Sequence, residues 1–250
     1  MAITRRVERI YRVRFDEAGP DGALSASGFL RYAQDLAWVH SESAGFGRDW
    51  YRERGLTWLV RAIELDLLEG VPYGSELCVS TEVLGLRRVW ARRRNEFRLA
   101  RQERMVALAL TDWVLLDSDG RLVRPPREIL DAFEAPAQFT PLRLARADPP
   151  AGAFTAEIRV RRADLDPMAH VNNAAYLDYV DEVFVDQSGS ERLPVPRRYR
   201  AEFKQPAEPD ARLTGTSWTA HDSWWLTLDA DGRSSFRASL EISPRLWVGG

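Results

Sequence analysis

The chain has 250 residues, 45% of them hydrophobic, which is enough apolar sequence to bury one large core or two smaller ones. Its net charge of -2 and its isoelectric point near 6.0 exclude the domain-wide positive balance that is typical of nucleic-acid binding. No apolar run approaches the roughly 18 residues that span a bilayer. We therefore expect no membrane span, and the charged residues near the start favour a cytoplasmic protein over a secreted one.

The first half of the sequence predicts one strand, one helix and then four strands. The strand is expected at 7–15, the helix at 27–43, and the further strands at 57–68, 75–85, 88–100 and 104–117. The helix prediction rests on apolar residues that recur at helical intervals from Phe29 to His40, with Ser25 or Ser27 able to cap the start. The later segments alternate between apolar and polar residues, as strands with one buried face do.

The same order of elements recurs in the second half. Residues 136–153 contain four prolines and little periodicity, so they are expected to link two compact units, at 1–135 and 154–250. After this linker we predict a strand at 156–162, a helix at 173–185 and strands at 197–204, 211–220, 223–230 and 234–243. An antiparallel sheet that must bury one face can wrap around a single long helix, which is the hot-dog arrangement. The predicted fold is therefore α+β, a double hot dog.

One segment, RRADLDPMAHVNNAAYLDYVDE at 161–182, brings acidic residues and a histidine to the start of a predicted helix. Asn172 or Asn173 can cap that helix, and the free N–H groups at its start can polarise a carbonyl. A carboxylate at Asp166 can activate water or attack a thioester, and His170 can bond the carboxylate, the water or the leaving sulfur. The alternative is a turn at Asp166 with a structural histidine and two capping asparagines.

The whole segment resembles the active-site motif of the acyl-acyl-carrier-protein thioesterases of plants and bacteria, a double hot-dog family. The first half also resembles that family, through LRYAQDLAWVHSESAGFG, GLTWLVRAIELDL and DWVLLDSDGRLVRPPREI. In the plant enzymes the motif is Asp-x-Asn-x-His-Val-Asn-Asn, with a downstream Tyr-x-x-Glu-Cys. The resemblance implies catalytic roles for Asp166 and His170, and it places Glu202 as a residue that positions water.

Two positions depart from the family motif. Met168 stands where the plant enzymes have asparagine, and Phe203 stands where they have cysteine, so a cysteine nucleophile at that position is excluded. The expected mechanism uses Asp166 as base or nucleophile, with helix-start amides for the oxyanion, and it needs no metal or cofactor. The lone Cys78 permits no internal disulfide and favours a reduced compartment.

The corresponding loop of the first half, residues 15–28, has no histidine, so that half is expected to shape an acyl-chain pocket. In the family it lines much of the acyl tunnel, and Trp38, Trp58 and Val60 are the candidates for chain contacts here. The expected partner is acyl carrier protein or acyl-CoA, and the chain is expected to be a monomer or a homodimer. Two basic runs, one at 87–98 and one at 197–204, could attract an acidic carrier or could be balanced by neighbouring acids.

Two other functions compete with hydrolysis of acyl-carrier-protein thioesters. One is an acyl-CoA thioesterase, because both donors present the same pantetheine-linked thioester. The other is a protein that holds acyl chains without cleaving them, which is suggested by Met168 and by the missing cysteine. A hydratase is disfavoured because the sequence has no His-Phe-Pro-Gly type segment.

Overall fold

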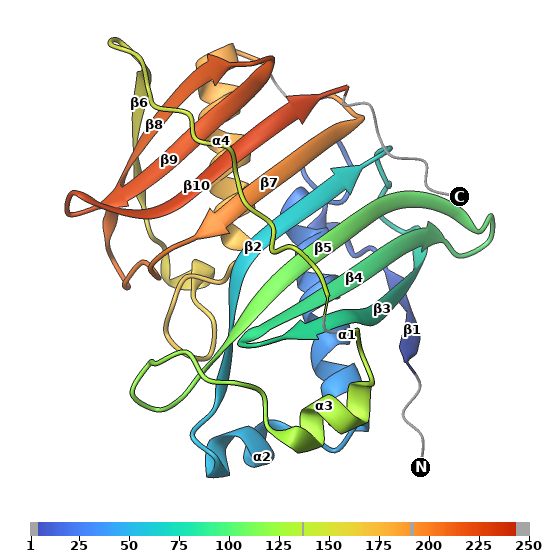
Figure 1. Ribbon diagram of the computed structural model, residues 1–250. Helices are drawn as coiled ribbons and strands as arrows, with labels where there is room; N and C mark the ends of the chain where they lie inside the picture. Colours follow the sequence, from blue (N-terminus) through green and yellow to red (C-terminus); the bar gives the residue numbers. More distant parts are fainter. Residues whose placement is uncertain (1–4, 137, 191–192, 244–250) are drawn as a thin grey trace.

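The computed structural model describes residues 5–136, 138–190 and 193–243 as one antiparallel sheet with helices on its concave side (Figure 1). The first half contributes β1 (Arg6–Arg12), β2 (Thr57–Leu67), β3 (Glu76–Arg87), β4 (Trp90–Leu99) and β5 (Arg104–Leu116). The second half contributes β6 (Phe154–Arg159), β7 (Arg197–Phe203), β8 (Arg212–Ala220), β9 (Ser223–Ala230) and β10 (Arg233–Ile242). The helices are α1 (Ala26–Ser43), α2 (Arg48–Glu53), α3 (Arg127–Phe133) and α4 (Ala175–Ser188).

The strand order is β1-β3-β4-β5-β2-β7-β10-β9-β8-β6, so β2 and β7 join the two halves into one continuous sheet. Residues in register across this junction include Leu65 with Tyr199 on the helix side. On the outer side, Arg198 donates to Asp66 at 2.5 and 2.8 Å, and Arg200 donates to Glu64 at 2.6 Å. A slip of one residue would separate these pairs and turn the apolar face outward, so the junction has a single favoured register.

Each half wraps its strands around one long helix, as the sequence predicts. Ser25 accepts a hydrogen bond from the Gly28 N–H at 3.1 Å and caps α1, and the predicted apolar stripe of that helix is buried. Both helices pack into one cluster of buried side chains that includes strands of both halves. The prediction of a double hot dog is confirmed by this topology and by the similar structures described below.

The expected linker carries no helix or strand where it is described, but it is not detached from the sheet. Residues 138–146, here called the strap, cross the outer face of the sheet from the first half to the second (Figure 1). Asp112 accepts the Leu142 N–H at 2.6 Å, and Glu202 accepts the Leu144 N–H at 2.8 Å. Guanidinium groups bond strap carbonyls: Arg87 to Phe139 at 2.9 Å, Arg92 to Thr140 at 2.9 Å and Arg237 to Leu144 at 2.9 Å. Side chains of both halves therefore hold the strap.

Three features differ from the sequence prediction. Neither α2 nor α3 was predicted, because helices of six and seven residues are too short to show a periodic pattern. The helix expected from 173 begins at Ala175, and the N-cap position is Ala174. Neither Asn172 nor Asn173 is that cap, since the chain first makes a separate turn at Asn172.

None of the helices in the described ranges is long and apolar enough to cross a membrane.

One carboxylate is held between α4 and β7 in an unfavourable environment for its charge. Tyr199 donates to Asp181 at 2.6 Å, and burial raises the pKa of Asp181 to about 6, with Arg197 and the Tyr199 hydrogen bond opposing the shift. A carboxyl whose folded pKa is raised favours folding while it is protonated, and this contribution is lost as pH rises from the unfolded pKa of about 4 to the folded value.

The Asp181→Asn variant is therefore expected to be more stable than the wild type at about pH 8, by about 2 kcal/mol, and to match it at about pH 4. The asparagine oxygen can still accept from Tyr199 but carries no charge. Urea unfolding at both pH values measures the difference. The neighbouring exposed residue supplies a control, Glu182→Gln, which should change stability little at either pH. Equal differences at the two pH values for Asp181→Asn would contradict this account.

Candidate active site

A tight loop at 165–171 carries the predicted catalytic pair. Leu165 and Val171 form an isolated antiparallel bridge, and the Asp166 N–H donates to the His170 carbonyl at 2.8 Å. The Asp166 Oδ1 accepts the N–H groups of Met168 at 2.8 Å and His170 at 3.3 Å. Two amides thus fix the orientation of the carboxylate and bond only one of its oxygens.

A buried aspartate anchors the base of this loop. Asp164 accepts the Arg161 N–H at 2.8 Å and the Tyr179 hydroxyl at 2.8 Å, and its own carbonyl accepts the Asn172 N–H at 2.8 Å. Arg161 and Tyr179 hold the pKa of Asp164 below its usual range although burial acts in the opposite direction. Asp164 therefore stays charged and fixes the loop against α4.

The chain between the loop and α4 presents backbone N–H groups to the same region. Asn172 Oδ1 accepts the Ala174 N–H at 2.9 Å, which closes a turn just before the helix. Among the described residues no acceptor is found for the Asn173 N–H, and Asn173 lines the cavity beside Asp166 and His170. This N–H group is consequently available to a bound carbonyl oxygen.

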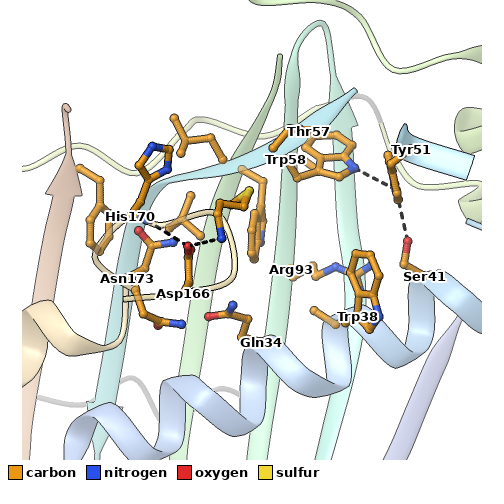
Figure 2. A pocket seen from close by; sticks show the side chains of 18 of the residues that line it. Gln34, Trp38, Ser41, Tyr51, Thr57, Trp58, Arg93, Asp166, His170 and Asn173 are labelled. Atoms are coloured by element: carbon orange, nitrogen blue, oxygen red, sulfur yellow. Dashed lines mark hydrogen bonds between the residues drawn. The ribbon is translucent and has the colours of Figure 1, made fainter. Parts of the chain in front are cut away.

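A cavity of about 960 Å³ extends from this loop into the first half of the chain. Figure 2 shows Asp166, His170 and Asn173 at one end and Tyr51 with Ser41 at the other. The far part is walled by apolar side chains of α3 and of strands β2 to β5: Val60, Val83, Leu86, Ala91, Trp113, Ile129 and Phe133. This shape suits a ligand with a reactive group at the loop and an apolar chain directed into the first half.

All of the predicted substrate-contacting residues line this cavity. Trp38 does so from α1 with 41% of its surface exposed, and Val60 is buried in β2. Trp58 donates from Nε1 to the Tyr51 hydroxyl at 3.0 Å, so its ring is fixed in the wall. Asn172 and Asn173 line the loop end of the cavity.

Glu202 is not brought to this site. It is not among the cavity-lining residues, and its two oxygens accept from Leu144 N–H of the strap and from Arg237 Nε, each at 2.8 Å. Successive residues of a strand point to opposite faces. In β7, Phe203 faces the cavity, so Glu202 faces the strap on the other side of the sheet.

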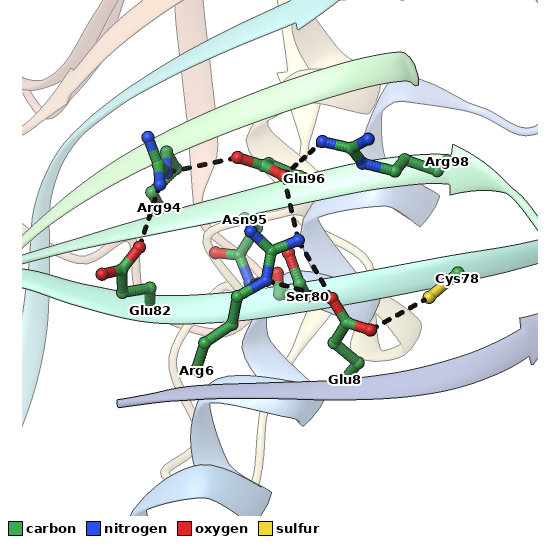
Figure 3. Close-up of polar contacts among 9 residues, drawn as sticks. All are labelled: Arg6, Glu8, Cys78, Ser80, Glu82, Arg94, Asn95, Glu96 and Arg98. Carbon is green, nitrogen blue, oxygen red and sulfur yellow. Dashed lines mark hydrogen bonds and ion pairs between the residues drawn. The ribbon is translucent and has the colours of Figure 1, made fainter. Parts of the chain in front are cut away.

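Several arginines of the two basic runs are paired with acids on the outer face. Figure 3 shows Arg94 between Glu82 and Glu96, with Arg98 and Arg6 also on Glu96, at distances of 2.9–3.4 Å. The second run is paired likewise, through Arg198 and Arg200. Cys78 lies beside this network at 3.7 Å from Glu8, and burial raises the pKa of its thiol. The paired arginines therefore belong to ion-pair networks on the outer face of the sheet.

Exposed cations also lie around the cavity. Arg48 and Arg52 lie on α2, Arg31 on α1, and Lys204 just beyond β7, and all four line the cavity while remaining exposed.

Within the described ranges no group of three or more His, Cys, Asp or Glu side chains is arranged to hold a metal ion.

Sequence reasoning missed two cavity residues that carry polar groups far from the loop. Tyr51 belongs to α2, which the sequence did not predict. Arg93 lies on the inward face of β4, in register with Thr111, between Ala91 and Asn95. The alternation of WARRRNEF could have indicated an inward-facing arginine. Ala91 and Phe97 lie an even number of residues from Arg93, so all three side chains point to the same face of the strand.

Fold and site together define a double hot-dog protein with one elongated cavity that ends at an Asp–His loop. Two family models match it: the acyl-ACP thioesterase N-terminal domain at residues 5–133 and the acyl-ACP thioesterase C-terminal domain at residues 148–224. The chain belongs to the acyl-ACP thioesterase family, and the resemblance noted in the sequence is confirmed.

Solved structures with the same fold include a 12:0-ACP thioesterase from Umbellularia californica, with a TM-score of 0.79, 20% identity, and coverage of 95% of this chain and 97% of that one. An acyl-ACP thioesterase from Bacteroides thetaiotaomicron has a TM-score of 0.78 and 14% identity over 95% and 97%. Among curated proteins, the oleoyl-acyl carrier protein thioesterase 1 of Arabidopsis thaliana is 24% identical over 231 residues, 82% of this chain. The chain spans 62% of the length of that plant protein.

Proposed function

We propose that this protein hydrolyses fatty acyl thioesters of acyl carrier protein and releases the free fatty acid. The observation that carries the proposal is the position of Asp166, His170 and Asn173 at one end of a cavity whose remaining wall is mostly apolar. A thioester at the loop would place its acyl chain in that cavity. Membership of the acyl-ACP thioesterase family supports the same reaction.

In the proposed reaction, Asp166 either takes a proton from water or attacks the thioester carbon itself. Its Oδ1 is held by two loop amides, and no donor among the described residues bonds the other oxygen, which can face the substrate. The Asn173 N–H stabilises the carbonyl oxygen as it becomes negative. His170 lines the same end and can protonate the sulfur as the C–S bond breaks. Product formation consumes one water and yields a fatty acid and a thiol.

The carrier is proposed from the charges around the cavity. Four cations are exposed there: Arg31, Arg48, Arg52 and Lys204. Arg31 also pairs with Asp178 at 3.6 Å, and Arg52 with Asp49 at 2.8 Å. An acidic carrier protein with a phosphopantetheine arm would be attracted to such cations. The proposal includes a cytoplasmic location, in keeping with a single free cysteine, while a monomer and a homodimer are both compatible with it.

The test is release of free thiol from matched acyl-carrier-protein and acyl-CoA substrates over a series of chain lengths. We expect turnover with both donors and a higher kcat/KM with the carrier protein, decreasing as salt is added. The Glu202→Gln variant is the matched carboxylate control and should keep its kcat, because this side chain bonds the strap. Binding without turnover would refute hydrolysis and favour an acyl-binding protein. A higher kcat/KM with acyl-CoA would reassign the carrier.

A further inference from the structure

A positively charged side chain lies inside the acyl cavity without an acidic partner. Arg93 comes from the inward face of β4 and lines the cavity. In the described part of the chain, no Asp or Glu oxygen lies within 4.0 Å of its guanidinium, whereas Arg92, Arg94 and Arg98 of the same strand are each paired with an acid. Figure 2 shows Arg93 between the Asp166 loop and the Tyr51 cluster.

Neutral groups surround this guanidinium. Arg93 Nη1 lies 3.1 Å from His40 Nδ1 and 3.5 Å from Thr81 Oγ1, and the guanidinium carbon lies 5.7 Å from the centre of the Phe133 ring. Since guanidinium nitrogens only donate, His40 Nδ1 must accept and carries no proton. Burial lowers the pKa of Arg93 to about 10, so the group remains charged at neutral pH.

The two carboxylates that line the cavity are engaged elsewhere. Asp166 is held by the amides of its loop, and Asp35 accepts the Tyr11 hydroxyl at 2.5 Å. Near Arg93, Tyr51 accepts the Trp58 N–H at 3.0 Å and lies 3.2 Å from Ser41 Oγ. Ser41 donates its proton to the Phe46 carbonyl at 3.1 Å, so the Tyr51 hydroxyl donates to Ser41. In the described lining of the cavity, no carboxylate therefore balances the charge of Arg93.

A plain hydrocarbon chain against Arg93 would remove water from the guanidinium and give nothing in return, which is unfavourable for a charged group. A carboxylate would replace the water with a charge-assisted and often bidentate contact. A hydroxyl or keto oxygen could accept a hydrogen bond but would leave the charge unbalanced.

We propose that the cavity selects acyl thioesters whose chain ends in a carboxylate, with Arg93 as the residue that recognises that end. The inference rests on the proposed thioesterase function and names its substrate class, an ω-carboxyacyl thioester. The thioester lies at the Asp166 loop, the methylene chain follows the apolar wall, and the terminal carboxylate meets the Arg93 guanidinium.

The test compares kcat/KM for ω-carboxyacyl, ω-hydroxyacyl and methyl-ended acyl thioesters of equal chain length, across a series of lengths. The wild type is expected to prefer the carboxylate at its best length, and Arg93→Met should lower the ratio of carboxylate-ended to methyl-ended substrate about 10- to 100-fold. For the Arg93→Lys variant, this ratio should lie between that of the wild type and that of Arg93→Met. The adjacent Arg94→Met, on the outer face and paired with Glu82, should leave the ratio unchanged.

A binding readout separates this inference from the hydrolase proposal. Calorimetry with the monomethyl ester of a dicarboxylic acid, and with the methyl ester of the matching fatty acid, measures the same preference without turnover. If no thioester is cleaved but the monomethyl ester binds more tightly and Arg93→Met abolishes the difference, the proposed function fails and the recognition stands. A wild type that prefers methyl-ended chains, or binds hydroxyl-ended chains as well as carboxylates, overturns the recognition.

Discussion

The Asp166→Asn variant is expected to lower kcat for thioester hydrolysis by about 10²–10⁴-fold. The asparagine oxygen can still accept the Met168 and His170 amides, so the loop keeps its shape while the negative charge is lost. Because that charge is required both to deprotonate water and to attack the thioester carbon, either route fails. Steady-state thiol release, with the circular dichroism spectrum as a check on folding, measures the effect.

A matched control for this charge removal is Asp186→Asn, on an exposed position of α4, which should leave kcat unchanged. The KM of Asp166→Asn should change much less than its kcat, since the acyl chain still fills the cavity. A variant that retained wild-type kcat would assign the chemistry to another group and would remove Asp166 from the site.

The Asp112→Ala variant is expected to destabilise the protein by about 3 kcal/mol, because it leaves Arg92 charged and mostly buried without its partner. Asp112 is 0% exposed and accepts two bonds from Arg92 at 2.7 and 2.8 Å. It also accepts the Leu142 N–H, so the same change releases the strap from β5. The free energy of unfolding from urea titration measures the loss.

The control for Asp112→Ala is the Asp119→Ala variant, which breaks an exposed ion pair. The Asp119 side chain is 62% exposed and its partner Arg121 is 77% exposed, so the expected loss is below about 1 kcal/mol. If both substitutions cost the same, the buried pair would hold the strap no more firmly than a surface contact does.

Much of this fold could be predicted because its elements carry strong periodic patterns. The stripe from Phe29 to His40 and the alternation of the strands fixed the type and order of the long elements, and the recurrence after 153 predicted a second sheet around a second helix. The motif at 166–173 was predicted at the start of the second long helix, and it lies just before α4, because short-range turn chemistry determines its shape.

What the sequence could not supply depends on packing between distant segments. The short α2 and α3 are stabilised by the cavity wall that they complete, and they have no periodicity of their own. Glu202 was assigned to the site by resemblance alone. Successive side chains of β7 point to opposite faces of the sheet, and that of Glu202 points to the strap. The strap was expected to be a spacer, since nothing in a proline-rich segment indicates which side chains of the sheet will bond its backbone.

Joining both halves in one chain means that every position of the sheet occurs only once. In a pair of identical subunits, a substitution that reshaped the apolar part of the cavity wall would occur in both subunits, and so it would also alter the wall near the loop. Here the wall around Arg93 and the loop at Asp166 belong to different halves, so each can change by itself. Under the proposed function, selection for a different acyl chain can thus act on one half while the Asp166 loop in the other half is kept.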